Sequence, residues 1–249
     1  MTDVELLRIE QGTIWKHDEH GRLEATRGRT GAPAPRLAIG TARDGRTVAI
    51  GSDVPDGVAT DLRRVIDAEP RSRDPAEEPR SLAVCEVMLR DAVGPLERSV
   101  GRAWIIESVP ASTTYAQIIR STDAGAHRFS GDVPAGFSWE PDEWRELMSG
   151  NLGRWAMCAV GGVAVSLCFS SRVSDEGMEA GVWTHPDHRG CGYAAASTAA
   201  WASLVLPSGR HVFYSINAEN LSSERVTKRL NLRPIGWHWI LSPAASSSS

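Results

Sequence analysis

The sequence lacks the long apolar segments that mark membrane proteins. Its 249 residues contain no run of about 18 apolar side chains, which is roughly the minimum for a membrane-spanning helix. The first residues, MTDVELLRIEQ, carry acidic side chains among the apolar ones, which is unlike a secretory signal peptide. We therefore expect a soluble, cytoplasmic protein without a membrane partner.

Lysine is almost absent from the chain. Only Lys16 and Lys228 are lysines among the 27 basic residues, and the formal net charge is -4. The arginines are spread along the whole chain and form no basic cluster. Binding to duplex nucleic acid normally requires a clustered basic surface, so we expect no nucleic-acid partner.

Closely spaced cysteines are absent as well. The four cysteines form no CxxC pair, so the sequence indicates neither a zinc ribbon nor a disulfide framework, and we expect free thiols. They are Cys85, Cys158, Cys168 and Cys191. His185 and His188 form an HxxH pattern, but Pro186 prevents a regular helix through them and no third ligand has a recognisable spacing. We therefore expect no bound metal.

The first half of the chain shows the mixture of patterns typical of an α/β fold. Residues 1–35 have no sustained period, and we expect them to be irregular. The elements predicted after them are two strands within 36–51 joined by the Asp44-Gly45 turn, helices over 58–66 and 81–93, a proline-rich loop over 69–80, a buried strand over 101–109 and a short helix over 113–120.

The second half has clearer periodicity. It predicts a helix over 140–149, two strands joined by a Gly161-Gly162 turn, a strand over 179–184, an alanine-rich helix from Tyr193, a strand over 211–217, a helix over 220–230 closed by Asn231, and a last strand over 235–241. A strand, helix, strand crossover places its two strands in parallel. The predicted class is therefore α/β with a central mixed sheet, antiparallel at first and parallel between 179–184 and 211–217.

The segment HPDHRGCGYAAAS joins that strand to the alanine-rich helix. Two glycines allow the backbone to turn tightly and leave its N–H groups uncovered. The helix beginning near Tyr193 adds unpaired N–H donors and the positive end of its dipole, and Arg189 adds a fixed charge. A phosphate or pyrophosphate group fits such a loop.

The loop and the following segment resemble two motifs of the GNAT superfamily of acyl-CoA-dependent N-acetyltransferases. EAGVWTHPDHRGCGYA matches motif A, in which Gln or Arg is followed by xxGx and then Gly or Ala, through Arg189, Gly192 and Ala194. FYSINAENLSSERVTKRLNLRPIGW matches motif B, through Asn220, Ser223, Val226 and Leu230. The resemblance is clear over 150–241 and begins more faintly near residue 101.

This resemblance implies a domain organisation and a donor. We expect a GNAT-like domain over 99–241, an N-terminal extension over 1–98 similar to that of longer bacterial members, and a polar tail over 242–249. The family binds acetyl-CoA, whose pyrophosphate would lie on the loop and whose pantetheine arm would pair with the preceding strand. The implied cofactor-binding residues are Val182, Trp183, Thr184, Arg189, Gly190, Cys191, Gly192, Tyr193, Ala194, Asn220 and Ser223.

Acetyl transfer to an amine requires a group that accepts a proton from the attacking nitrogen. The resemblance favours Glu179 as this base, since family members often carry a carboxylate on the strand that leads to the loop, and Glu176 is a weaker alternative. The family's usual acid is a tyrosine in the motif B helix, but Thr227 stands at that position. Ser215, Tyr214 or solvent remain as proton donors for the departing thiolate, and since neighbouring strand residues face opposite sides, at most one of the two points into the cleft.

The resulting hypothesis is an acetyltransferase that moves an acetyl group from acetyl-CoA to a small primary amine. Two alternatives stay open, namely acetylation of a protein N-terminus or lysine, and a non-catalytic module that only binds acyl-CoA. Direct transfer needs no enzyme nucleophile, so Cys191 is expected to be a passive thiol. Trp183 is expected either to lie in the core or to line the acceptor cleft, and His185 lies near the predicted acetyl position.

Overall fold

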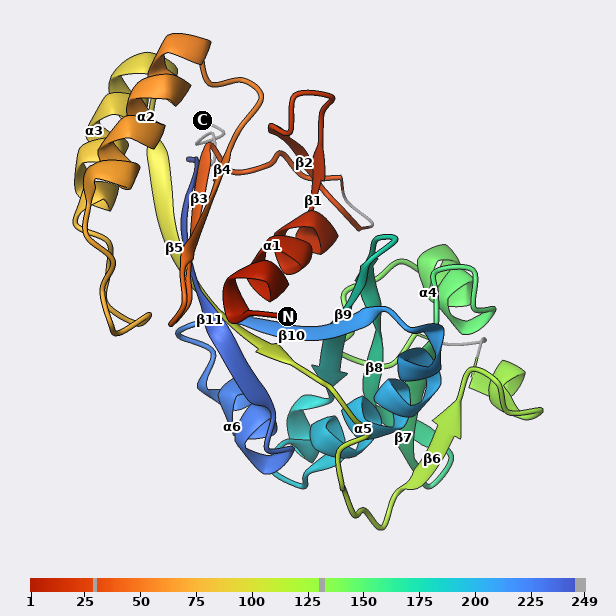
Figure 1. Cartoon of the computed structure of the whole chain (residues 1–249). Helices are drawn as coiled ribbons and strands as arrows, with labels where there is room; N and C mark the ends of the chain where they lie inside the picture. The colour runs from red at the N-terminus through yellow and green to blue at the C-terminus, as the bar shows by residue number, and fades with distance from the viewer. Residues whose placement is uncertain (29–30, 130–132, 245–249) are drawn as a thin grey trace. The chain divides into compact units, whose positions relative to one another are not determined.

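The computed structural model describes residues 1–28, 31–129 and 133–244, and these residues have the predicted α/β class with a mixed sheet. They divide into two compact units (Figure 1). Unit 1 comprises Met1–Trp104, Ser215–Asn220 and the residues from Pro234 onward, and unit 2 comprises Ile105–Tyr214 and Leu221–Arg233. Unit 1 thus contains two short C-terminal segments besides the N-terminal residues.

Unit 1 contains most of the N-terminal elements and the last strand. They are α1 (Asp3–Ile14), β1 (Trp15–His17), β2 (Leu23–Thr26), β3 (Leu37–Thr41), β4 (Arg46–Ile50), α2 (Asp56–Ala68), α3 (Ser81–Val93), β5 (Leu96–Ile105) and β11 (Arg233–Pro243). The strand order is β4-β3-β11-β5, and β3 pairs antiparallel with both neighbours. The hairpin and helices predicted between 36 and 93 are confirmed.

Successive side chains of β3 face opposite sides of the sheet and contribute to two hydrophobic clusters in unit 1. Leu37 and Ile39 face a cluster formed with α2 and α3, whereas Ala38 faces a cluster with Trp15 and Leu23. Figure 1 shows α2 and α3 side by side, with α1 on the other side of β3 and β4. The sheet of unit 1 is thus covered by helices on both faces.

The prediction that residues 1–35 are irregular is wrong, because α1 begins at residue 3. The Thr2 hydroxyl accepts a hydrogen bond from the Glu5 amide, and the Glu5 carboxylate accepts one from the Thr2 amide at 2.7 Å, which forms a capping box. The buried face of α1 also includes the polar side chains of Glu10 and Gln11, and Glu10 pairs with His238 at 2.9 Å. These polar core residues interrupt the apolar period that would have revealed the helix.

Unit 2 contains the elements around the motifs. They are β6 (Gln117–Arg120), α4 (Pro141–Met148), β7 (Trp155–Val160), β8 (Val163–Val173), β9 (Gly177–Thr184), α5 (Tyr193–Val205), β10 (His211–Asn217, of which the last three residues belong to unit 1) and α6 (Leu221–Arg229). The strand order is β10-β9-β8-β7-β6, with β10 and β9 parallel and the other pairs antiparallel. The predicted parallel crossover is confirmed.

The helix predicted over 113–120 is wrong, because Gln117–Arg120 form a strand. Ile118 pairs with Cys158 and Ile119 with Met157 of β7, and the Ile119 side chain is buried. Two adjacent β-branched residues favour a strand once a partner strand is available, and that partner lies about 40 residues further along the chain. The remaining predicted elements of unit 2 are confirmed, and Asn231 closes α6 with a φ of 50°.

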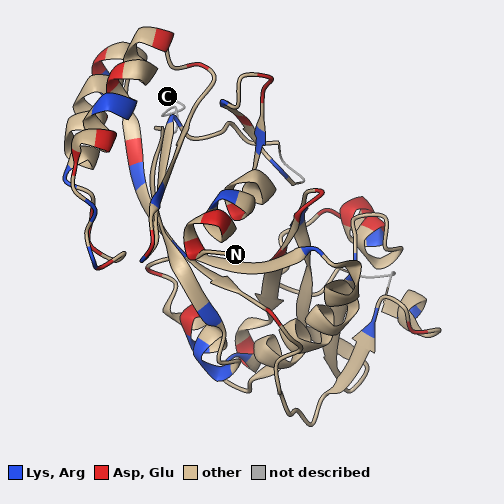
Figure 2. Ribbon diagram, in the orientation of Figure 1, with Lys and Arg blue, Asp and Glu red and all other residues tan. Residues whose placement is uncertain are grey.

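The helix α5 packs on β7, β8 and β9 and is the most deeply buried helix of unit 2. It carries no charged side chain, and Figure 2 shows it without blue or red, in contrast to α6. Trp201 is fully buried in the core, and its indole N–H donates to the Ser170 hydroxyl at 3.1 Å. This packing fixes the N-terminus of α5 next to the end of β9.

Three further predictions can be compared with the described residues. The four cysteines are free thiols, of which only Cys191 is exposed. Among the described residues, every helix is too short or too polar to cross a lipid bilayer. Of the polar tail predicted over 242–249, residues 242 and 243 belong to β11, and residues 245–249 lie outside the described part.

Candidate functional site

The loop between β9 and α5 has the predicted strand, loop, helix arrangement. A short 3-10 turn over Pro186–His188 follows β9, and α5 begins at Tyr193. Gly190 and Gly192 have φ values of 81° and 83°, in the left-handed region that side chains other than glycine rarely adopt. The two glycines therefore produce the tight turn that the sequence predicts.

The N-terminus of α5 leaves its backbone N–H groups without a side-chain cap among the described residues. Gly192 is the N-cap, whereas α1 and α4 each begin with a capping box. An uncapped N-terminus combines free N–H donors with the positive end of the helix dipole. This end of α5 is thus suited to an anionic group.

A cavity of about 430 Å³ lies directly over this loop. Its lining residues come from the end of β9, the loop, the first turn of α5 and one face of α6, and they are Thr184, His188, Arg189, Gly190, Gly192, Tyr193, Ala194, Ala195, Ser222, Arg225, Val226 and Arg229. Three of them are arginines, and none of the described lining residues is acidic. Of the residues predicted to bind the donor, the structure brings Thr184, Arg189, Gly190, Gly192, Tyr193 and Ala194 together here.

The arginines of α6 were not predicted as site residues. The guanidinium group of Arg229 lies so close to Gly192 that a Cβ atom built there would be 2.5 Å from its Nη1. Ser222, Arg225 and Arg229 recur at the helical spacing that places them on one face, and this spacing is visible in the sequence. It was overlooked because the motif B pattern draws attention to Asn220 and Ser223.

Strand β9 pairs with β8 over most of its length and with β10 at its start. Its register with β10 covers Gly177 to Glu179, paired with His211 to Phe213. From Ala180 to Thr184, the pairs within unit 2 are those with β8.

Glu179 is a buried carboxylate on β9. Its exposed fraction is 3%, and its Oε2 atom accepts a hydrogen bond from Nη1 of Arg172 at 2.7 Å. Arg172 is on β8 beside a β-bulge, and about one third of its side chain is exposed. This ion pair holds the buried carboxylate at one position. Glu176, the weaker alternative, is exposed in the turn between β8 and β9.

Tyr214 and Ser223, both predicted site residues, lie together in unit 2. Burial raises the pKa of the Tyr214 phenol well above its ordinary value, and a hydrogen bond with the Ser223 side chain acts in the opposite direction. Thr227 is buried, and its hydroxyl donates to the Glu224 carbonyl one helical turn earlier at 2.9 Å. The hydroxyl of Thr227 is therefore engaged within α6.

Ser215 and Asn220 belong to the segment 215–220 of unit 1. Ser215 is half-buried on β10, and Asn220 is exposed directly before α6, where its amide donates to the Asn217 carbonyl at 2.9 Å. The cavity over the β9–α5 loop, in contrast, lies within unit 2.

The remaining predicted residues surround the loop. Val182 pairs with Cys168 across the strands, and Trp183 is half-buried, with its indole N–H donating to the Gly136 carbonyl at 3.1 Å. Cys191 is exposed, and its thiol is 3.8 Å from the Arg189 carbonyl. Among the described residues, no group of three or more His, Cys, Asp or Glu side chains is arranged to hold a metal ion.

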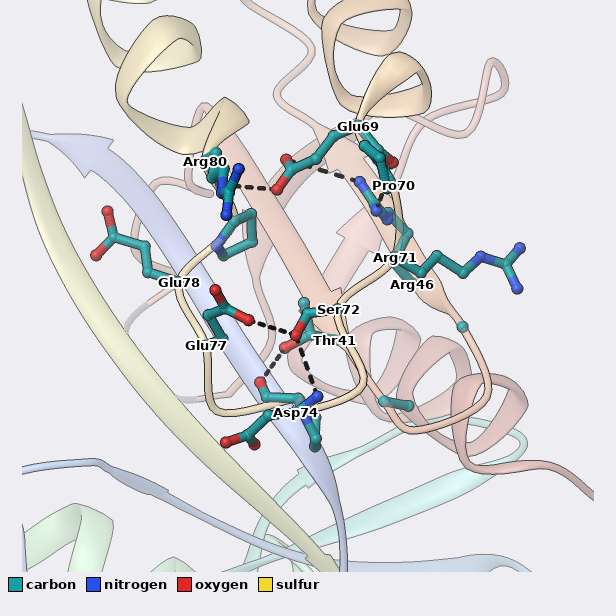
Figure 3. Close-up of a pocket in the computed structure, with 14 residues that line it drawn as sticks. Thr41, Arg46, Glu69, Pro70, Arg71, Ser72, Asp74, Glu77, Glu78 and Arg80 are labelled. Atoms are coloured by element: carbon teal, nitrogen blue, oxygen red, sulfur yellow. Dashed lines mark hydrogen bonds and ion pairs between the residues drawn. The ribbon is translucent and has the colours of Figure 1, made fainter.

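A second cavity, of about 210 Å³, lies in unit 1 beside the loop over residues 69–80 (Figure 3). Its charged side chains are engaged in holding this loop. Glu69 accepts hydrogen bonds from the amides of Arg80 and Ser81, and Arg46 donates to the carbonyl oxygens of Ile66 and Glu69. These contacts explain why the proline-rich segment is ordered between α2 and α3.

A family model described as an acetyltransferase (GNAT) domain matches residues 102–233, which is more than half of the chain. A search of curated protein sequences finds no significant match.

Solved structures with a similar fold include three bacterial proteins. A GNAT-family acetyltransferase from Colwellia psychrerythraea is 12% identical, with 96% of this chain and 94% of that chain covered and a TM-score of 0.48. A GCN5-related N-acetyltransferase-like protein from Streptococcus suis is 17% identical, with coverage of 96% and 98% and a TM-score of 0.42. A GNAT-family protein from Novosphingobium aromaticivorans is 18% identical with a TM-score of 0.42, and the match covers 60% of this chain and spans 66% of the length of that protein.

Proposed function

The chain belongs to the GNAT family of acetyltransferases, and we propose that it transfers an acetyl group from acetyl-CoA directly to the primary amine of a small molecule. The observation that carries the donor assignment is the cavity over the β9–α5 loop, with its uncapped helix N-terminus and three arginines. A small-molecule acceptor is the part of the proposal that goes beyond family membership.

The residues of the cavity fit the phosphate groups of the donor. The N–H groups of the loop and the first turn of α5 would donate to the pyrophosphate, as would the guanidinium groups of Arg189 and Arg229. Arg225 lies one helical turn before Arg229 and would contact a further phosphate. The edge of β9 from Ala180 to Thr184 would hydrogen-bond the amides of the pantetheine arm.

In the proposed reaction, the amine nitrogen attacks the thioester carbonyl carbon, the C–N bond forms and the C–S bond breaks. The proton leaving the nitrogen passes to Glu179, directly or through a water molecule. Glu179 suits this role because it is buried and held at one position by Arg172. The thiolate leaves as CoA and takes up a proton from Tyr214, Ser215 or solvent.

The acid role has a structural basis only for Tyr214. Burial raises the pKa of this phenol, so at neutral pH it keeps the proton that an acid must donate. Its hydrogen bond with Ser223 connects it to the helix that lines the donor cavity.

The experiment separates donor binding from catalysis. Calorimetry of the whole chain with acetyl-CoA and with CoA measures binding, and release of free thiol measures transfer to a panel of amines. Glu179→Gln should leave acetyl-CoA affinity unchanged and slow turnover by about 10²–10⁴-fold. Asp175→Asn, at an exposed carboxylate in the turn before β9, is the matched control and should retain full turnover, and Glu176→Gln tests the weaker alternative base.

The outcomes also distinguish the alternatives. A silent small-amine panel together with acetylation of a peptide N-terminus or lysine would identify a protein acetyltransferase. Tight acetyl-CoA binding with no transfer to amines or peptides would favour a module that only binds acyl-CoA. Equal turnover of the Glu179→Gln and unmodified proteins would remove Glu179 from the mechanism.

A further inference from the structure

Three residues of β9 lie on the face that carries the proposed base. Because successive strand residues alternate, Glu179, Gly181 and Trp183 share one face. Phe169 of β8 is directly opposite Gly181, and a Cβ atom built on Gly181 would lie 2.7 Å from Cζ of its ring. The absence of a side chain at Gly181 thus lets the Phe169 ring lie over the backbone of β9, two residues from Glu179.

The segment before α4 adds two more rings to this face. The Trp139 ring is 5.0 Å from Phe169, and the Phe137 ring is 5.2 Å from Trp139 and 5.4 Å from Trp183, measured between centroids. The hydrogen bond from the Trp183 indole to Gly136 holds the segment against the strand. All four residues are half-buried. We refer to Phe137, Trp139, Phe169 and Trp183 as the aromatic wall.

The aromatic wall continues into the donor cavity. Trp183 is 6.2 Å from His185, His185 is 5.5 Å from His188, and His188 is 6.2 Å from Tyr193, again between ring centroids. His188 and Tyr193 line the cavity over the loop. A continuous series of rings therefore extends from the strand of the proposed base to the phosphate-binding end of the site.

We propose that the acceptor carries its primary amine on a short chain attached to an aromatic ring, and that the aromatic wall binds that ring. This inference rests on the proposed function. Aromatic rings prefer edge-to-face and offset contacts at the centroid separations found within the wall, so a substrate ring can join the series. Before it loses its proton, the ammonium group would also be attracted to the ring faces.

The chemistry of the wall disfavours an amino sugar. The hydroxyl groups of a sugar need several polar partners when they leave water. On this face, the Glu179 carboxylate and the Arg172 guanidinium group pair with each other. An aryl group buries apolar surface against the rings and leaves this pair intact.

The test compares amines by thiol release from acetyl-CoA in the whole chain. 2-Phenylethylamine should be acetylated with a kcat/KM at least about tenfold above that of ethylamine or D-glucosamine, since one added ring contact and its burial correspond to roughly that factor. Calorimetry of 2-phenylethylamine with the CoA-saturated protein should show binding independently of turnover.

Matched variants separate recognition from folding. Phe169→Leu and Phe137→Leu should lower kcat/KM for 2-phenylethylamine by about tenfold, with little change for ethylamine and unchanged acetyl-CoA affinity. Phe129→Leu is the control, because Phe129 packs against the same hydrophobic cluster but is not one of the four residues of the aromatic wall. It should leave the ratio between the two amines unchanged.

Several results would overturn the inference. They are a preference for D-glucosamine or ethylamine over 2-phenylethylamine, no binding of 2-phenylethylamine to the CoA complex, and equal losses for both amines in Phe169→Leu. Such results leave the proposed function standing if another amine is acetylated. Absence of acetyl-CoA binding would instead contradict the proposed function itself.

Discussion

Replacing Gly192 by alanine tests how α6 and the loop cooperate in binding the donor. Gly192 has a φ of 83°, and a Cβ atom there would lie 2.5–2.8 Å from three atoms of the Arg229 guanidinium group. The left-handed backbone costs a residue with a side chain about 1–2 kcal/mol. The Cβ would additionally force the end of Arg229 away from the loop, since a flexible side chain moves more easily than the backbone.

The effect on donor affinity follows from this displacement. A hydrogen bond to a charged group contributes about 1.5–3 kcal/mol, so losing the contact between Arg229 and a phosphate should weaken acetyl-CoA binding by roughly 10–150-fold. Calorimetry of the whole chain measures this loss. Arg229→Ala alone should produce a loss of similar size.

Gly209→Ala is the matched control for backbone strain. Gly209 has a φ of 75° in the same unit, but open space surrounds its Cβ position and it does not line the cavity. This variant should lose about 1–2 kcal/mol of folding stability and retain its acetyl-CoA affinity. Adding Gly192→Ala to Arg229→Ala should cause little further loss of affinity. Normal acetyl-CoA affinity in Gly192→Ala, or fully additive losses in the double variant, would show that a side chain at position 192 does not act through Arg229.

Three further predictions concern stability. Thr2→Ala removes the capping box of α1 and should lower the free energy of unfolding by about 0.5–2 kcal/mol in urea melts, and an unchanged midpoint would contradict the role of the cap. Asn231→Ala removes the short polar side chain that makes a φ of 50° tolerable, and should lower the free energy of unfolding by about 1 kcal/mol. Asn231→Gly should be tolerated, and thermal melts of the two variants compare them. Burial raises the pKa of the Cys85 thiol to about 11 and that of Cys158 to about 12, from 9.0. Between pH 9 and about 11, these thiols stay protonated in the folded protein but ionise in the unfolded chain. The free energy of unfolding should therefore keep its full value below pH 9 and fall over this range by about 1.4 kcal/mol per pH unit for each thiol. Urea melts at pH 8 and pH 10 with equal midpoints would contradict this.

The strongest sequence signals were those in which local chemistry and long-range packing agree. Gly190 and Gly192 between a strand and an alanine-rich helix predicted the loop, because left-handed glycines and an uncapped helix start are both local properties. The parallel pairing of β9 with β10 followed from the crossover that the helix requires.

The features that sequence reasoning missed depend on partners far along the chain. α1 was overlooked because its buried face holds Glu10, whose partner His238 is 228 residues away. β6 was assigned to a helix because its partner strand, β7, comes only after α4 in the chain. Arg229 became recognisable as a site residue only when α6 was placed against Gly192.

The contact between Arg172 and the proposed base, Glu179, could not be predicted from the sequence either. The sequence contains both Arg172 and Glu179, seven residues apart on adjoining strands. Only the β-bulge between Ser170 and Arg172 sets the register that brings the guanidinium group to the carboxylate. A bulge adds one residue to one strand, and no pattern in this segment indicates where that residue lies.

Titration calorimetry of the whole chain shows directly whether the cavity between the β9–α5 loop and α6 binds acetyl-CoA. We predict saturable binding of acetyl-CoA and of CoA at one site per chain, weakened by at least about tenfold in Arg229→Ala. If neither ligand binds measurably, or if Arg229→Ala binds acetyl-CoA as tightly as the unmodified protein, this cavity is not the acetyl-CoA site.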